Sequence, residues 1–199
     1  MQYIFLVIIG LLSIGCTTKV APITNYTIAY TTRSANNSPV VYPDTTIKVA
    51  QTQSSALLVS TKMRYMQGAY KGYTYNNSAW MIAPADGVYR AIVTKLQNAR
   101  IFKQVATRYS KVLPDVVLQS SVEEFMQHYD NELQHSYARV SITFELIKSD
   151  SLRVIGTKTF TKEVKVHSLD AQGGVEALNK ALEDILDEMV VWLKKQNRL

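Results

Sequence analysis

Residues 137–148 read Tyr-Ala-Arg-Val-Ser-Ile-Thr-Phe-Glu-Leu-Ile-Lys, and they form the clearest strand pattern in the chain. Apolar and polar side chains alternate along this stretch, and its apolar members are Val140, Ile142, Phe144 and Leu146. A strand with this period of two buries one face and leaves the other polar. The sequence therefore predicts a β-meander in this half of the chain. The polar face of its sheet would be exposed to solvent or would line a water-filled space.

Strand patterns also occur on both sides of this stretch. Residues 115–125 and 154–166 alternate in the same way, and Asp150-Ser151 supplies the turn before the second of them. Upstream, shorter strand patterns and a hairpin that bends at Gly68 or Gly72 are predicted, the strands at residues 25–31, 46–50 and 101–106 and the hairpin at 62–75.

Two stretches have the 3.6-residue period of an amphipathic helix. Pro84 opens the first, in which apolar side chains recur at Val88, Ile92 and Leu96. The second follows a predicted turn at residues 170–174, and its apolar stripe consists of Val175, Leu178, Leu182, Ile185, Met189 and Trp192. We therefore predict the α+β class, with a mostly antiparallel sheet of about five to seven strands and two main helices packed on one face.

The predicted hairpin holds the densest group of aromatic side chains, which are Tyr65, Tyr70, Tyr73 and Tyr75, with Trp80 just beyond. Aromatic residues suit strands, so a cross-strand ladder is one interpretation. Tyrosine and tryptophan are also enriched at interaction hot spots, so a surface that docks a partner is the other.

Basic residues are concentrated in the first half of the chain. The formal net charge is +6. Between Lys62 and Lys111, Asp86 is the only acid among many lysines and arginines, whereas acids dominate residues 176–188. The basic segment could face anionic lipid head groups or an acidic partner, or it could be a solvated face. A nucleic-acid partner is not expected, because the leader described next predicts export.

The N-terminus reads as a secretory leader. An uncharged apolar run ends in Ser13-Ile14-Gly15-Cys16, and Cys16 is the only cysteine. The run is short for a bilayer span, and small residues before a lone cysteine are typical of a bacterial lipoprotein. The pattern departs from the usual one because no side chain before Lys19 is positively charged and because Ser13 stands where leucine is normal.

This leader predicts three parts of the chain. Residues 1–15 are the signal peptide, residues 16–24 are a tether lipidated at Cys16, and residues 25–199 are a single periplasmic domain. An uncleaved anchor helix and a non-lipidated signal peptide are the alternatives. Thr17 follows Cys16 where aspartate would signal retention in the inner membrane, which favours the outer membrane.

No catalytic or metal-binding constellation is apparent. The histidines His128, His135 and His167 share no ligand spacing with carboxylates or with the cysteine. His128 and His135 flank a predicted turn at residues 129–134, and we expect them to be solvated loop residues. No phosphate loop or nucleophile elbow is present, so we expect neither an enzyme nor a metal or cofactor.

Several weak signatures occur in one order along the chain. They are Tyr26 and Ile28 after the cysteine, the aromatic hairpin leading to Trp80, Pro84 at a helix start, Phe102, Asp115 before Val116-Val117-Leu118, Val122 and Phe125, and Ala177-Leu178-Asn179-Lys180-Ala181-Leu182 in the last helix. In this order the chain resembles the ABC-type transport auxiliary lipoproteins, the family of the PqiC-like lipoproteins.

The resemblance implies a role rather than a reaction. Members act beside an ABC transporter, with its permease and ATPase, and beside an MCE-domain protein, in moving lipids between the two bacterial membranes. They are thought to form homo-oligomeric rings at the outer membrane, held there by the covalent lipid, such as palmitate, on the cysteine that corresponds to Cys16. A structural assembly lipoprotein of another outer-membrane or secretion complex is the alternative function.

Charge and aromatic content alone suggest where such a protein could contact its partner or lipid. The candidate surface covers residues 62–75 and 90–111, and its candidate contact residues are Arg64, Tyr65, Lys71, Tyr73, Tyr75 and Trp80.

Overall fold

The computed structural model describes residues 21–29 and 40–196, and the predicted signal peptide and Cys16 lie outside them. The described part contains nine strands and two helices. In chain order these are β1 (Thr24–Tyr26), β2 (Tyr42–Val49), β3 (Gln53–Ser54), β4 (Lys62–Gln67), β5 (Lys71–Trp80), α2 (Pro84–Ala99), β6 (Phe102–Ala106), β7 (Val116–Tyr129), β8 (Ser136–Lys148), β9 (Arg153–Lys165) and α3 (Ala171–Lys194). No helix in the described ranges is both long and apolar enough to cross a bilayer.

The α+β class is confirmed, but the sheet is mixed and has more strands than expected. The meander β7–β8–β9 is antiparallel, as the alternating patterns predict. Along its other edge β7 pairs in parallel with three short strands in succession, β2, β3 and β4. The prediction of a mostly antiparallel sheet of five to seven strands is therefore wrong, because alternation shows which residues are buried but not the direction of the neighbouring strand.

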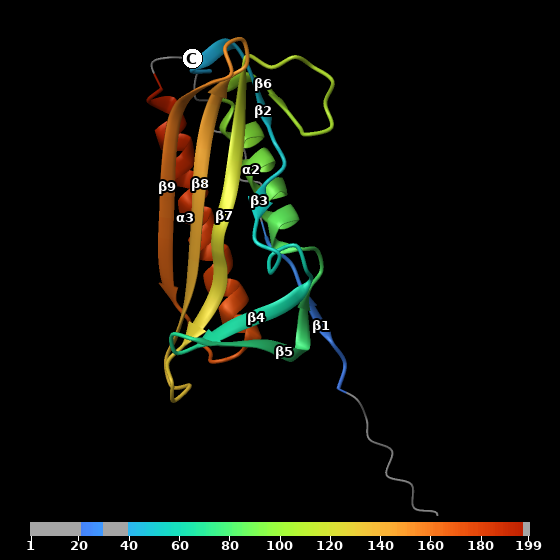
Figure 1. The fold of residues 1–199 in the computed structure, drawn as a ribbon, viewed down its shortest axis with the longest axis vertical. Helices are drawn as coiled ribbons and strands as arrows, with labels where there is room; N and C mark the ends of the chain where they lie inside the picture. The colour runs from blue at the N-terminus through green and yellow to red at the C-terminus, as the bar shows by residue number, and fades with distance from the viewer. Residues whose placement is uncertain (1–20, 30–39, 197–199) are drawn as a thin grey trace, which may run out of the picture.

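The core lies between the meander and the helices. In Figure 1 both helices run behind the sheet, α3 along β8 and β9 and α2 beside β2. The predicted apolar faces of the strand at residues 137–148 and of the last helix are buried here; Phe144 and Ile185 have no solvent exposure. Full burial of one such side chain stabilises the fold by about 1.5–3 kcal/mol. The two periodic patterns are thus confirmed by the packing that they predict.

Helix α3 begins earlier than expected. Residues 170–174 do not form a turn, because Asp170 caps the helix by accepting a hydrogen bond from the Gly173 N–H at 2.8 Å. This bond lowers the pKa of the Asp170 carboxyl. A Cβ atom on Gly174 would lie 1.8 Å from the Gln127 side-chain oxygen, so this glycine serves close packing of the helix on β7 rather than a bend.

The molecule has two distinct ends, which Figure 1 shows at the bottom and the top. The lower end consists of the β4–β5 turn, the β7–β8 turn and the start of α3, and β1 also lies at this end. The upper end consists of the segment from Phe102 to Asp115, which follows α2, together with the β8–β9 turn and the start of β2. Strand β7 runs from the upper end to the lower end.

Candidate functional site

The predicted hairpin is confirmed as β4 and β5, and its tyrosines form a cross-strand ladder. Tyr65 lies opposite Tyr73 in the register, and their ring centroids are 5.5 Å apart. The Tyr65 ring also lies 4.6 Å from that of Tyr75 and 5.3 Å from that of Tyr129 on β7. Aromatic pairs at such distances add about 0.5–1.5 kcal/mol beyond burial. The ladder interpretation is therefore confirmed, and docking stays a separate prediction.

A buried polar network ties this ladder to β7. The Tyr75 hydroxyl donates to the Gln127 carbonyl oxygen at 2.9 Å and lies 2.7 Å from the Tyr129 hydroxyl. Gln127 is only 2% exposed, and its amide donates to the Ser136 hydroxyl at 2.8 Å. Burial, with the Tyr129 hydroxyl as a second cause, raises the pKa of Tyr75 well above its ordinary value. The hydroxyl thus stays protonated at neutral pH, which suits a structural donor.

The tip of the hairpin is exposed and is held against the β7–β8 turn. The Gly68 N–H donates to the Tyr129 carbonyl at 2.9 Å, and the Gln67 amide donates to the Asn131 carbonyl at 2.7 Å. Gly68 supplies the bend with a φ of 59°. Tyr70 at this tip is 95% exposed. The tip is therefore a supported surface that presents an aromatic ring to its surroundings.

The candidate contact residues separate into different environments. Lys71 and Tyr73 are exposed, whereas Tyr65 and Tyr75 are half-buried within the ladder. Arg64 is half-buried, and its Nε has no hydrogen-bond partner among the described residues. Trp80 is 4% exposed and packs edge-on against Phe125 with a centroid distance of 5.7 Å. Trp80 is therefore a core residue, and it takes no part in the surface considered below.

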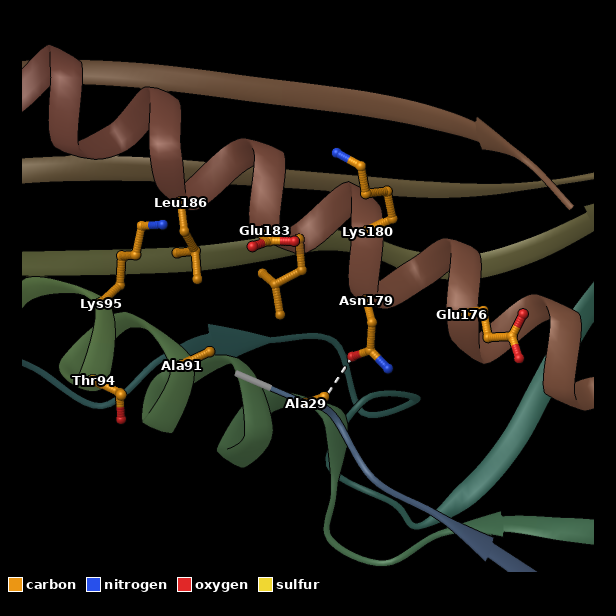
Figure 2. A pocket seen from close by; sticks show the side chains of 10 residues that line it. Ala29, Ala91, Thr94, Lys95, Glu176, Asn179, Lys180, Glu183 and Leu186 are labelled. Atoms are coloured by element: carbon orange, nitrogen blue, oxygen red, sulfur yellow. Dashed lines mark hydrogen bonds between the residues drawn. The ribbon is translucent and has the colours of Figure 1, made fainter. Parts of the chain in front are cut away.

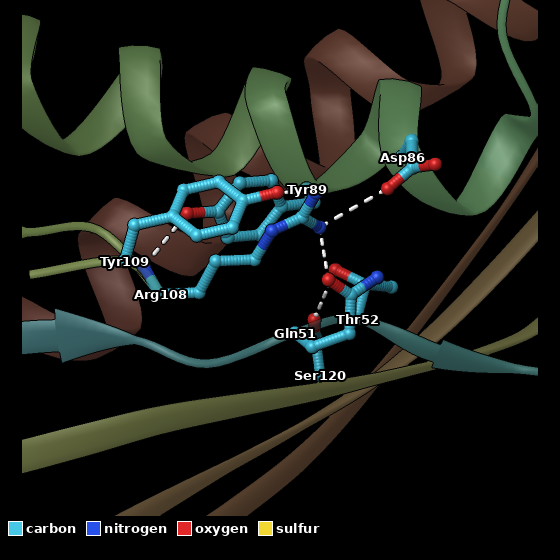
Figure 3. Close-up of polar contacts among 7 residues, drawn as sticks. All are labelled: Gln51, Thr52, Asp86, Tyr89, Arg108, Tyr109 and Ser120. Carbon is cyan, nitrogen blue, oxygen red and sulfur yellow. Dashed lines mark hydrogen bonds and ion pairs between the residues drawn. The ribbon is translucent and has the colours of Figure 1, made fainter.

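Two basic residues of the candidate surface, Arg108 and Lys95, are used in internal ion pairs. The Arg108 guanidinium lies over the rings of Tyr89 and Tyr109, 4.4 Å and 4.7 Å from their centroids, and 3.0 Å from the Asp86 carboxylate (Figure 3). Its side chain also bonds to Gln51, and its backbone N–H donates to the Tyr89 hydroxyl. Arg108 therefore fastens the segment after β6 to helix α2.

A groove of about 330 Å³ runs between α2 and α3 (Figure 2). Lys95 on α2 forms an ion pair beside it with Asp187 on α3. On the α3 side the Asn179 side chain accepts a hydrogen bond from the Ala29 N–H at 2.9 Å. The lining contains charges of both signs, Lys180 and Glu183 among them, so it favours no single class of ligand.

Three further basic residues of the candidate surface follow α2, in the segment at the upper end. Arg100, Lys103 and Lys111 are exposed in this segment. The segments of the upper end also carry exposed apolar side chains, namely Tyr109, Val112, Leu113, Leu152 and Val154. The structure therefore does not bring residues 62–75 and 100–111 together, because the length of the sheet separates them. Leu152 and Leu133 are sites that the sequence did not indicate. Each is an exposed leucine with a positive φ, 53° and 58°, which side chains of this type rarely adopt.

The histidines are only partly as expected. His128 belongs to β7 rather than to a loop, because this strand continues beyond Phe125 as far as Tyr129. The His128 ring stacks on that of Tyr137 with a centroid distance of 5.0 Å and bonds to Glu124. His135 does lie in the β7–β8 turn, where it bonds to Asp130 at 2.9 Å. The described residues contain no group of three or more histidine, cysteine or acidic side chains placed to hold a metal ion.

The geometry defines a two-helix α+β domain with a mixed sheet, and exposed aromatic or apolar side chains occur at both of its ends. The sequence model of the ABC-type transport auxiliary lipoprotein component matches residues 26–190, and the chain belongs to this family. The resemblance drawn from the ordered signatures is thus confirmed.

Known structures share the fold. The crystal structure of a Xanthomonas campestris protein of family DUF330 is 19% identical, with a TM-score of 0.78, and the match covers 88% of this chain and 97% of that one. A crystal structure of an uncharacterized protein is 14% identical, with a TM-score of 0.66 and coverage of 86% and 99%. No curated protein matches the sequence significantly.

Proposed function

We propose that this protein is a non-catalytic auxiliary subunit of an ABC/MCE-type system that moves lipids between the two bacterial membranes. The observation that carries the proposal is the family match over residues 26–190, which supports a place beside an ABC-type transporter. The partners in this proposal are the transporter's permease and ATPase and an MCE-domain protein. Rings of several copies at the outer membrane are part of the same proposal.

The proposal places the protein on the periplasmic side of the envelope through a covalent lipid on Cys16. Several acyl chains, at about 0.8 kcal/mol for each buried CH₂, anchor a protein stably where one chain binds only marginally. The small residues before Cys16, the absence of any other cysteine and the family's lipoprotein character support this anchor.

We assign the candidate contacts of this proposal to the two ends separately. At the lower end the candidates are Arg64, Tyr65, Lys71, Tyr73 and Tyr75 of the hairpin. At the upper end they are the basic residues that follow α2, of which Lys111 is the nearest in sequence to the exposed Leu113. Lipid and protein partner are different occupants, and the two ends allow them to be tested one at a time.

Affinity purification after crosslinking in the native host tests the proposed function. The wild-type chain should recover an MCE-domain protein and an ABC permease, whereas Cys16→Ala should recover neither, because the unanchored domain leaves the membrane. Recovery of a secretion or envelope-assembly complex instead would contradict the transport role. Equal recovery with Cys16→Ala would remove lipidation from the proposal.

A further inference from the structure

We infer that the lower end of the domain rests on the lipid surface that holds the anchor, with the hairpin tip around Tyr70 as the contact. This inference rests on the proposed lipidation of Cys16. It extends the proposed function because it names lipid, and not the protein partner, as the occupant of the hairpin end. It also fixes which end of the domain faces away from the membrane.

The length of the tether decides which end is close to the bilayer. Five residue steps separate Cys16 from Ala21, the first described residue, and five steps span at most about 18 Å. The described chain begins next to β1, at the lower end (Figure 1). Strand β7 has 14 residues and connects the two ends, a length of about 46 Å at about 3.3 Å per residue. The tether is therefore too short to let the domain stand on its upper end at the same bilayer.

The side chains at the lower end suit a membrane interface. The exposed ring of Tyr70 stands at the outermost turn of the hairpin, and Tyr73 and Leu169 are partly exposed beside the same end. Tyrosine is enriched at the level of lipid head groups because its ring is apolar and its hydroxyl is polar. The tip lies at the same end of the domain as the anchored terminus, although β1 pairs with the other end of β5, at Ser78 to Trp80. An apolar and aromatic tip at this end therefore gains free energy by entering the head-group region.

The adjoining turn adds an independent observation. Leu133 is 44% exposed and adopts the left-handed φ of 58°, where glycine or asparagine would fit without strain. The Asn131 carbonyl accepts the bond from Gln67 that fixes this turn against the hairpin tip. An exposed leucine kept in a strained conformation, in the turn that is bonded to the hairpin tip, enlarges the apolar surface of this end.

The charges at this tip indicate how the contact works. In the two turns Lys71 is opposed by Asp130 and Glu132, so the tip carries no excess of positive charge. Attraction to anionic lipid therefore does not drive the contact, and insertion of aromatic and apolar side chains does. The contact should accordingly occur on zwitterionic lipid and should resist salt, unlike one made by a polybasic surface.

A fluorescence-quenching experiment on the full lipidated protein tests this inference. Lipidation consumes the only native cysteine, so Tyr70→Cys provides a single thiol for an environment-sensitive dye such as NBD. The matched control is Leu113→Cys, because Leu113 is 92% exposed at the upper end. The labelled proteins are reconstituted in phosphatidylcholine–phosphatidylethanolamine vesicles with and without spin-labelled phosphatidylcholine. Since interfacial side chains sit within about 5–10 Å of the acyl boundary, we expect about twofold quenching at position 70 and little at position 113.

The outcomes separate this inference from the proposed function. Lipidated protein in which position 70 is not quenched, or in which position 113 is quenched as strongly, overturns the lipid contact and leaves the anchor intact. Quenching at position 70 that disappears in about 0.5 M salt, where the screening length is only about 4 Å, overturns the apolar mechanism. If mass spectrometry detects a second dye, bound to Cys16, the Cys16 thiol is free and the lipid anchor is absent. That result would overturn both the lipid contact and the proposed lipidation.

Discussion

The two ends of this domain are built differently. At the lower end the Tyr65 ladder, the hydroxyl bonds of Tyr75 and the cap at Asp170 lock the hairpin, β7 and α3 together. At the upper end exposed apolar and basic side chains stand on connecting segments, and Leu113 lies among them. The comparison teaches that the lower end holds its hairpin through a ladder and a polar network shared by several elements, whereas the upper end fastens its segment after β6 mainly through Arg108 and leaves its apolar side chains exposed.

A matched pair of glycine substitutions should break the lower end and spare the upper one. In Gly174→Ala the new Cβ would meet the buried Gln127 side chain, which the polar network holds in place, so we expect a loss of about 1–3 kcal/mol in the free energy of unfolding. In Gly156→Ala the nearest atoms, at 3.2 Å, belong to the side chains of Gln196 and Trp192, which can move, so we expect a change below about 1 kcal/mol. Urea denaturation of both variants measures the difference; equal effects would contradict the rigid packing at the start of α3.

Removal of one hydroxyl should loosen the same end by less. Tyr75→Phe leaves the buried Gln127 carbonyl oxygen without its donor, and we expect a loss of about 1–2 kcal/mol. The control Tyr73→Phe keeps the ladder and changes an exposed ring, so its effect should stay within about 0.5 kcal/mol. Thermal unfolding of the two variants tests this; if Tyr73→Phe cost as much as Tyr75→Phe, the network would not be what fastens the hairpin.

The smallest effect should come from the two strained leucines, one at each end. Leu133→Asn and Leu152→Asn both place a residue that tolerates a positive φ, so each should gain up to about 1 kcal/mol in stability. Leu152 is 80% exposed, so its replacement removes little packing. Only Leu133→Asn should also reduce the lipid quenching of a dye at position 70. Equal loss of quenching in both variants would remove the distinction between the ends.

The candidate contact surface shows how far local sequence carries. The tyrosines of the hairpin were identified from the sequence, and their pairing follows from the strand pattern and the bend at Gly68. Trp80 could not be placed, because a tryptophan at a strand end has the same local pattern whether it faces solvent or, as here, Phe125. The positive φ of Leu133 and Leu152 has no sequence signal, since leucine is not a residue that turns of this kind require.

The sequence by itself determined which faces of β8 and α3 are buried, where α2 begins and that the chain carries its family's ordered signatures. Each of these follows from periodicity or from a residue's own conformational preference, which are local properties. Only the tertiary structure decided that β2 and β4 run parallel to β7 and that His128 lies within that strand. It also decided that residues 62–75 and 100–111 lie at opposite ends, and that Lys95 between them pairs with Asp187 on α3. Strand direction and the distance between surface groups depend on contacts between residues far apart in the chain, and a local pattern does not contain them.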